Sequence, residues 1–409
     1  MHIAVVCLPA TGHVNPTLPV VAELVRRGHR VTYATSEKYA DAVRATGAAF
    51  FASGTDFTAQ LPRHSLQPPA GGSPGAMMNP LMSGLMQRLL LGAREEFPVL
   101  LARLAADPPD ALCYDAMTLA GKMAAAKLNV PDIALLPTYA SNEHFSMREL
   151  MPERLPAAAL RAWKEAREQV SGFAAEQGLE NIGFMDGVPA SLNISFIPRA
   201  FQPAGDTFDG RFHFVGPCLG KRVSTGSWQA PAAGPLLFIS LGTTPLNDRP
   251  DFFRMCLQAF GNSRWQVAIA TGEQIQAAEL GAIPANVDVR PFFPQLEVLR
   301  HASVFLSHTG MNSTMESLYF GVPLVAVPQQ PEQAANARRV EELGLGRRLD
   351  PATLSAALLR STVEEVDADQ RIRGNVHAMS ASVRAAGGPE AAADAIEGFL
   401  RAQGPPPGA

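Results

Sequence analysis

The feature that most constrains this chain is a double alternation of short apolar runs and helical segments. In the first half, such runs lie at residues 3–8, 30–34, 111–115 and 131–137. In the second half, they lie at residues 236–241, 265–270, 287–290, 303–306 and 323–327. Continuous apolar runs between helices are typical of parallel strands that are covered on both faces. The sequence therefore predicts an α/β fold with two doubly wound, Rossmann-like domains facing across a cleft.

A stretch rich in Pro, Gly and Ser separates the two sets and spans residues 217–235. Its composition is typical of a linker. We therefore expect an N-terminal domain at residues 1–216 and a C-terminal domain at residues 236–387. Residues 388–409 begin as an Ala-rich amphipathic helix, which we expect to pack back on the N-terminal domain. A length of 409 residues suits two domains of this kind.

Composition argues against several classes of protein. The chain has 34 Lys and Arg against 38 Asp and Glu, so it lacks the basic balance of a nucleic-acid-binding protein. Its 4 cysteines form no CxxC pair, which argues against a zinc knuckle or a disulfide scaffold. Residues 3–8 are too short for the core of a signal peptide, and no stretch approaches the roughly 18 apolar residues that a membrane span needs. We expect a soluble, cytoplasmic protein.

Polar residues in the second half gather just after the predicted strand at residues 303–306. His308 and Gly310 belong to a short turn, and Asn312 and Ser313 begin the next predicted helix. Free backbone N–H groups and the positive end of the helix dipole favour an anion at such a place. The turn therefore suits a diphosphate without a metal ion. A helix cap beside a core histidine is the alternative explanation for the same residues.

The run from residue 292 to residue 333 resembles the donor-binding signature of the UDP-glycosyltransferase family, whose two-domain fold is called GT-B. Weaker similarity extends over nearly the whole chain and is closest to bacterial macrolide and other natural-product glycosyltransferases. The resemblance implies that the N-terminal domain binds the acceptor and that the C-terminal domain binds a nucleotide sugar.

The resemblance assigns a set of residues to donor binding. They are Ser240, Gly242, Thr243, Phe292, Gln295, His308, Gly310, Asn312, Ser313, Glu316, Glu332 and Gln333. Phe292 stands where the family usually has a tryptophan that stacks on the base, and a phenyl ring can still stack with less area. Glu316 matches the ribose-binding glutamate, and the pair Glu332 and Gln333 matches residues that bond sugar hydroxyls. These residues suit UDP-glucose, which we favour, or a dTDP-sugar.

A second candidate site follows the first predicted strand, in the sequence Gly12-His13-Val14-Asn15-Pro16. A histidine there lies at the carboxyl edge of the sheet, where ligands bind in doubly wound domains, although a capping or core histidine would also fit. The motif resembles the acceptor-side motif of the family, in which this histidine is the general base. Asp115 ends a strand at the same edge and matches the aspartate that bonds the histidine, whereas Asp110 precedes that strand and would lie at the opposite edge.

Two segments are candidates for the acceptor pocket. Residues 62–84 are rich in Pro, Gly, Ser and Met, which predicts a long loop or insertion, and residues 138–147 follow a predicted strand. Methionines in such a loop could form an adaptable apolar wall, or they could be ordinary core. The acceptor-binding residues that we expect are Met77, Met82, Met86, Tyr139, Asn142 and Phe145.

These observations together predict an inverting, metal-independent O-glycosyltransferase. The acceptor would be an apolar natural product such as a macrolide or a polyphenol, and the nucleotide sugar would be a co-substrate, with no further cofactor. The carboxylate pair Asp367 and Asp369 lies in a charged stretch with no preceding strand, so we expect a solvated surface there and no metal site. A GT-B nucleotide-sugar epimerase and a catalytically silent nucleotide-sugar-binding partner protein are the alternatives.

Overall fold

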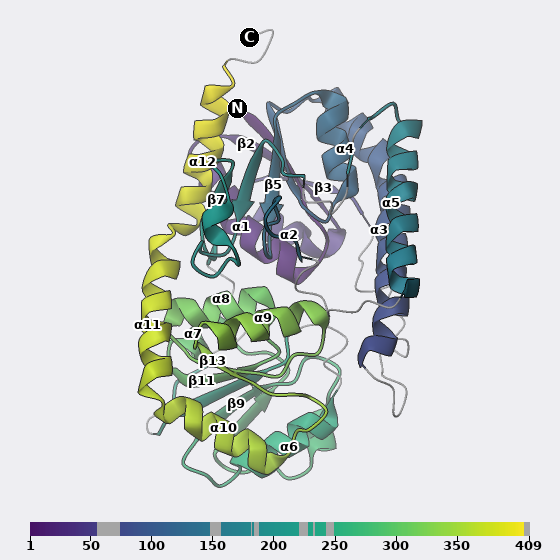
Figure 1. Ribbon diagram of the computed structural model, residues 1–409. Helices are drawn as coiled ribbons and strands as arrows, with labels where there is room; N and C mark the ends of the chain where they lie inside the picture. The colour runs from purple at the N-terminus through teal and green to yellow at the C-terminus, as the bar shows by residue number, and fades with distance from the viewer. Residues whose placement is uncertain are drawn as a thin grey trace. The chain divides into compact units, whose positions relative to one another are not determined.

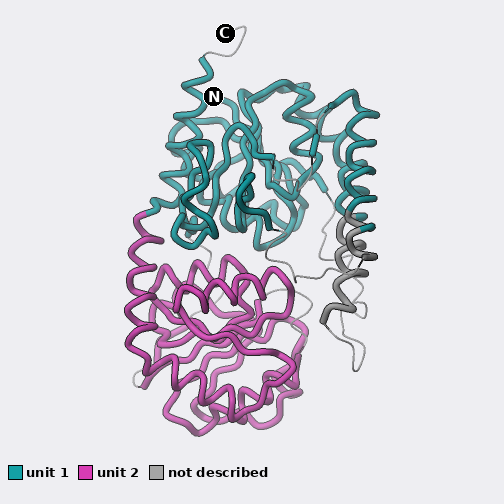
Figure 2. Tube along the Cα trace, in the orientation of Figure 1, with its two compact units in different colours: residues 1–220, 386–409 teal, residues 221–385 magenta. Residues whose placement is uncertain are grey.

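The computed structural model in Figure 1 describes most of the chain. It covers residues 1–54, 74–147, 157–180, 182–183, 188–220, 228–231, 234–242 and 249–404, without the side chains of residues 74–86, 157–160 and 162–163. The chain divides into two compact units (Figure 2). Unit 1 comprises Met1–Gly220 and Ala386–Ala409, and unit 2 comprises Lys221–Ala385.

Unit 1 is built on a sheet that has seven parallel strands within the described residues, in the order β3-β2-β1-β4-β5-β6-β7. The strands are His2–Val6 (β1), Arg30–Thr35 (β2), Ala49–Ala52 (β3), Ala111–Asp115 (β4), Asp132–Leu136 (β5), Leu192–Ser195 (β6) and Phe212–Phe214 (β7). The helices are Thr11–Arg26 (α1), Ala40–Arg44 (α2), Pro74–Ala106 (α3), Leu119–Leu128 (α4), Ala157–Glu176 (α5) and Gly388–Ala402 (α12). The direction of the strand order reverses between β1 and β4.

Alternate residues of the buried strands face two separate layers of helices. Ile3 and Val5 of β1 pack in one apolar cluster with residues of α1 and α12. Ala4 and Val6 face the other way and pack in a second cluster with residues of α3, α4 and α5. This two-sided burial explains why β1 is apolar from Ile3 to Val6 and does not alternate with polar residues.

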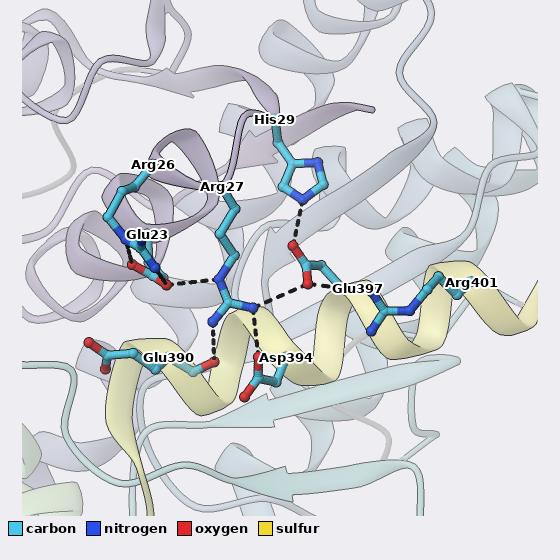
Figure 3. Close-up of polar contacts among 8 residues, drawn as sticks. All are labelled: Glu23, Arg26, Arg27, His29, Glu390, Asp394, Glu397 and Arg401. Atoms are coloured by element: carbon cyan, nitrogen blue, oxygen red, sulfur yellow. Dashed lines mark hydrogen bonds and ion pairs between the residues drawn. The ribbon is translucent and has the colours of Figure 1, made fainter.

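Charged side chains hold α12 against α1, as Figure 3 shows. Arg27 donates through Nε to Glu23 Oε1 at 2.8 Å, and through Nη1 to Asp394 Oδ1 at 2.6 Å and Glu397 Oε2 at 3.1 Å. His29 Nε2 lies 2.8 Å from Glu397 Oε1. The C-terminal helix thus belongs to unit 1, although it follows unit 2 in the sequence.

Unit 2 repeats the same topology on a sheet that has six parallel strands in the part of the chain described, in the order β10-β9-β8-β11-β12-β13. The strands are Leu236–Ser240 (β8), Gln266–Ala270 (β9), Val287–Arg290 (β10), Ala302–Ser307 (β11), Leu324–Ala326 (β12) and Gly346–Arg348 (β13). The helices are Pro250–Phe260 (α6), Gln295–Leu299 (α7), Met311–Phe320 (α8), Pro331–Glu342 (α9), Ala356–Ala368 (α10) and Gln370–Ala385 (α11). Here the direction of the strand order reverses between β8 and β11.

The structure corrects two expectations from the sequence. The predicted loop at residues 62–84 is wrong from Pro74 onward, because α3 begins there; proline is tolerated in the first turn of a helix, and the Met and Leu residues that follow favour helix. The predicted solvated surface at Asp367 is also wrong. Asp367 is only 8% exposed and accepts hydrogen bonds from Arg264 at 2.6 Å and Arg373 at 2.8 Å. Among the described helices, none is long and apolar enough to cross a membrane.

Candidate functional site

In each unit a predicted site histidine lies where the strand order reverses. In unit 1, β1 leads into α1, which carries His13, and β4 ends at Asp115. In unit 2, β8 ends at Ser240 and β11 leads into the turn that contains His308. Ligands of doubly wound sheets bind outside the carboxyl ends of the strands at this point of reversal. Each unit therefore presents one candidate ligand site.

His13 and Asp115 form a direct pair in unit 1. His13 Nδ1 lies 2.6 Å from Asp115 Oδ2. Asp115 is fully buried, and its Oδ1 accepts a hydrogen bond from the backbone N–H of Met117 at 2.8 Å, so both carboxylate oxygens are held. Because a carboxylate only accepts, Nδ1 carries a proton, and in the neutral imidazole Nε2 then carries the lone pair. The side chain of His13 is 23% exposed, which suits a group that must meet a substrate.

The first turn of α1 sets the position of His13. The helix begins at Thr11, so His13 belongs to the helix itself, and its N–H donates to Ala10 O at 2.9 Å. Asp110 lies at the other end of β4, where its Oδ2 accepts from the backbone N–H of His2 at 2.7 Å. Of the two aspartates that flank β4, only Asp115 is therefore in contact with His13.

His308 lies in the turn between β11 and α8 and is 6% exposed. Burial disfavours the charged imidazole and lowers its pKa to about 4, although a hydrogen bond to the backbone carbonyl of Ser240 acts in the opposite direction. Two glycines make room for the ring. A Cβ atom at Gly242 would lie 2.6 Å from His308 Cε1, and one at Gly310 would lie 2.5 Å from His308 Nε2. His308 is thus a neutral, tightly enclosed group near pH 7.

Thr309, the next residue of this turn, has a left-handed backbone with φ of 59°. A β-branched residue is strained in this region, so neighbouring contacts must hold it there. Its N–H donates to Ser307 Oγ at 3.1 Å. Its Oγ1 lies 2.6 Å from the backbone carbonyl of His308 and 3.0 Å from that of Gln333 in α9, so its one proton is shared between them. The turn after β11 is therefore fixed by α9 as well as by its own strand.

The first turn of α8 joins three predicted donor-site residues. Gln295 Nε2 donates to Glu316 Oε2 at 2.7 Å and to Ser313 Oγ at 3.2 Å. Asn312 and Ser313 occupy the first turn of α8, with Gly310 as the residue that caps it. Backbone N–H groups of a first turn have no partner within the helix, so this end of α8 can bind an anion.

Phe292 and the α9 residues complete the predicted donor set. Phe292 follows β10 and is 45% exposed, so its ring can accept a stacked base, whereas Phe293 next to it packs on Phe238 with 6.1 Å between ring centroids. Glu332 Oε1 accepts from Asn336 Nδ2 at 2.6 Å, and Gln333 Oε1 accepts from the backbone N–H of Gln329 at 2.8 Å.

Comparison with known proteins shows the family. The chain is 41% identical to the NDP-glycosyltransferase YjiC of Bacillus licheniformis, with 98% of each chain covered. The chain belongs to the family of nucleotide-sugar glycosyltransferases. The predicted family is thereby confirmed, and the chain is a glycosyltransferase.

Other relatives and one solved structure agree with this family assignment. The chain is 39% identical to the demethyllactenocin mycarosyltransferase of Streptomyces fradiae, and the match covers 98% of this chain and 86% of that protein. It is 34% identical to the oleandomycin glycosyltransferase of Streptomyces antibioticus, where the match covers 98% of this chain and 91% of that protein. Residues 255–398 match the family described as erythromycin biosynthesis protein CIII-like, C-terminal domain. The calicheamicin glycosyltransferase CalG4 superposes with a TM-score of 0.82 at 33% identity over 99% of both chains. The predicted GT-B fold is confirmed.

The glycosyltransferase buries the three predicted acceptor residues that follow β5. Tyr139 stacks on Phe201 with 6.0 Å between ring centroids, and Phe145 meets the same tyrosine edge-on at 6.4 Å. Asn142 Nδ2 donates to the backbone carbonyl of Thr207 at 3.1 Å. These contacts hold the loop after β5 in place, and direct contact with an acceptor stays a prediction. Thr243 and the side chains of Met77, Met82 and Met86 lie outside the described residues.

One residue of the glycosyltransferase's donor region escaped the sequence reasoning. Asn336 lies one helical turn beyond Glu332 in α9, and it donates both to Glu332 and to the backbone carbonyl of Thr309. The donor-binding signature of the family ends at Gln333, so it gave no reason to consider Asn336. A polar residue one helical turn from a proposed sugar ligand was the available signal.

Proposed function

We propose that this glycosyltransferase moves a sugar from a nucleotide diphosphate sugar to a hydroxyl group of an apolar natural product, with inversion at the anomeric carbon and without a metal ion. The His13–Asp115 pair carries the proposal, because it supplies a base with an oriented imidazole at the carboxyl edge of the unit 1 sheet. Relatives named as an oleandomycin glycosyltransferase and a calicheamicin glycosyltransferase support a natural-product acceptor.

His13 acts as the general base in this proposal. Nε2 takes the proton of the acceptor hydroxyl while the hydroxyl oxygen attacks the anomeric carbon from the face opposite the diphosphate. The bond between the anomeric carbon and the diphosphate oxygen breaks, and the nucleoside diphosphate leaves with the electron pair. The carboxylate of Asp115, 2.6 Å from Nδ1, stabilises the imidazolium that forms. An α-linked donor therefore gives a β-glycoside.

Unit 2 binds the donor in this proposal. The diphosphate lies at the first turn of α8 and beside His308, where backbone N–H groups and the helix dipole stabilise the negative charge of the leaving group. Phe292 stacks on the base, and Glu316 with Gln295 bonds the ribose. Glu332 and Gln333 bond the sugar. Since neutral donors and a helix end take the diphosphate, we propose that no metal is needed, with UDP-glucose favoured over a dTDP-sugar.

Product analysis tests this function. The full chain is mixed with UDP-glucose or dTDP-glucose and with an apolar phenol or a macrolide, with and without EDTA, and the products are analysed by mass spectrometry and by NMR of the anomeric proton. We expect a new β-glycoside whose yield EDTA does not change. Release of nucleotide without a new glycoside would contradict transfer, and an epimerised nucleotide sugar would support the epimerase alternative. An α-glycoside would contradict inversion, and loss of activity in EDTA would contradict metal independence.

A further inference from the structure

We infer that Asn336 is a positioning residue of the donor site, which fixes the carboxylate of Glu332 and the turn after β11 relative to each other. The inference rests on the proposed function, because it concerns how that same site holds a nucleotide sugar. It assigns a role to a residue that contacts neither the acceptor nor, in the proposal above, the donor.

The contacts of Asn336 link two parts of the donor site. The residue lies in α9 and is fully buried. Its Nδ2 donates to the backbone carbonyl of Thr309 at 2.9 Å and to Glu332 Oε1 at 2.6 Å. A carbonyl oxygen and a carboxylate oxygen only accept hydrogen bonds, so the NH₂ group and not the oxygen of the amide must face them. The two N–H groups of the same amide therefore donate to Thr309 and Glu332, one to each.

The amide oxygen of Asn336 shows that packing alone does not explain why an asparagine stands at this position. Asn336 Oδ1 is buried and has no hydrogen-bond partner within the described part of the chain. An unpaired buried acceptor costs free energy, which an apolar side chain of similar size would avoid. An apolar side chain, however, could not donate to Thr309 and Glu332. At this position an asparagine leaves one buried acceptor unpaired and donates two hydrogen bonds in return.

The turn that Asn336 supports needs such support. Thr309 is fully buried with a left-handed backbone. Its Oγ1 lies 3.0 Å from the backbone carbonyl of Gln333, and its backbone carbonyl accepts from Asn336 Nδ2. Both sides of this strained residue are therefore tied to α9. Its two chain neighbours, His308 and Gly310, form the diphosphate side of the site. A continuous set of contacts runs from the sugar end at Glu332, through Asn336, to the diphosphate turn.

Calorimetric titration of the full-length protein with UDP-glucose and with UDP tests the inference. For Asn336→Ala we expect the Kd of both ligands to rise about tenfold, because the diphosphate turn and Glu332 each lose a hydrogen bond. For Glu332→Gln we expect a higher Kd for UDP-glucose and an unchanged Kd for UDP, because only the sugar end changes. An unchanged Kd of UDP in Asn336→Ala would overturn the link to the turn.

A second variant separates hydrogen-bond donation from shape. Asn336→Asp keeps the shape of the side chain but removes both donated hydrogen bonds, so we expect it to bind UDP-glucose no better than Asn336→Ala does. Wild-type affinity in Asn336→Asp would show that shape suffices and would overturn the inference. Thermal melts followed by circular dichroism identify the variants that are folded at the assay temperature.

Asn193→Ala is the matched control. Asn193 is 2% exposed in β6 of unit 1, and its Nδ2 donates to the carbonyl of Ala190 at 2.9 Å. This variant loses a buried asparagine of the same kind, and we expect wild-type Kd values. Equal weakening in Asn193→Ala and Asn336→Ala would mean that general destabilisation is the cause. If the wild type itself binds neither UDP-glucose nor dTDP-glucose, the proposed donor fails, and that result is distinct from a failure of the inference on Asn336.

Discussion

The two units place a histidine beside the same point of strand reversal and surround it in opposite ways. His13 is partly exposed and bonded to the buried carboxylate of Asp115, whereas His308 is buried, bonded to a backbone carbonyl and enclosed by Gly242 and Gly310. A carboxylate stabilises an imidazolium, while burial without a countercharge destabilises it and lowers the pKa of His308 to about 4. One topology thus supports a carboxylate-bonded histidine in unit 1, which we propose as the base, and a neutral enclosed histidine in unit 2.

The largest effect is expected from Asp115→Asn. The amide keeps the shape of the carboxylate, but it carries no charge to stabilise the imidazolium and can hold the ring in the wrong tautomer. We expect kcat to fall roughly 10³-fold or more, with the KM of the donor within about twofold of wild type. Steady-state kinetics with each substrate varied measures both. Asp110→Asn, at the opposite end of β4, is the control and should leave kcat unchanged. A kcat for Asp115→Asn within tenfold of wild type would mean that the carboxylate beside His13 does not matter for catalysis.

His308 should make the stability of unit 2 depend on pH. Its folded pKa is about 4, below the ordinary value near 6.5, so between these values the unfolded chain binds more protons. Its contribution is fully present above pH 6.5 and is lost as the pH falls toward 4, on the order of 3 kcal/mol in total. Urea unfolding followed by tryptophan fluorescence, to which the buried Trp265 of unit 2 contributes, measures it. In His308→Gln this component should disappear, and parallel profiles for wild type and variant would contradict the account.

Gly310→Ala should weaken donor binding and affect the chemical step less. The new Cβ would lie 2.5 Å from His308 Nε2, so the ring or the turn must move. We expect the Kd of UDP-glucose to rise about tenfold in calorimetric titration. Gly374→Ala in α11 is the control, because nothing lies within 4 Å of its Cβ position. Wild-type affinity in Gly310→Ala would mean that the enclosure of His308 has no role in the donor site.

The smallest effect is expected from the loss of the Glu23 carboxylate in α1. The pH range of this effect differs from that of His308. Hydrogen bonds from Arg26 and then Arg27 lower the pKa of Glu23 to about 2. Its contribution is present above the ordinary pKa near 4.5 and is lost as the pH falls toward 2, a lower range than that of His308. Glu23→Gln should lower the free energy of unfolding by about 1 kcal/mol at pH 7.

Urea unfolding of Glu23→Gln measures this loss, and Glu37→Gln is the control. The carboxylate of Glu37 is 72% exposed and 3.9 Å from its Arg44 partner, so its loss should change little. Equal losses in the two variants would mean that the paired carboxylate at Glu23 contributes no more than an exposed one.

The sequence predicted the central strands and the residues at their carboxyl ends, because β1, β4, β8 and β11 are nearly continuous apolar runs. It missed β3, β6, β7 and β13, which are three or four residues long. Short length alone is not the reason, because β10 and β12 are equally short and were predicted. In the site, the helix end at α8 and the placement of His13 and Asp115 at one edge followed from local order along the chain.

Features that depend on distant contacts could not be predicted. The left-handed backbone of Thr309 is maintained by α9, more than twenty residues away, and no property of threonine suggests it. Asp367 is buried because Arg264, distant in sequence, neutralises it. The low pKa of His308 arises from burial of its ring, for which two glycines in different turns leave room. Each of these depends on packing between elements that are far apart in the sequence.

The most direct test of the central claim, that His13 is the base and does not serve the donor, is His13→Ala. Transfer is measured by mass spectrometry of the glycoside, and the Kd of UDP-glucose is measured by calorimetric titration on the same sample. We expect transfer to fall roughly 10³-fold or more while the Kd stays within about twofold of wild type. Transfer at the wild-type rate, or a loss of donor affinity that matches the loss of transfer, would contradict it.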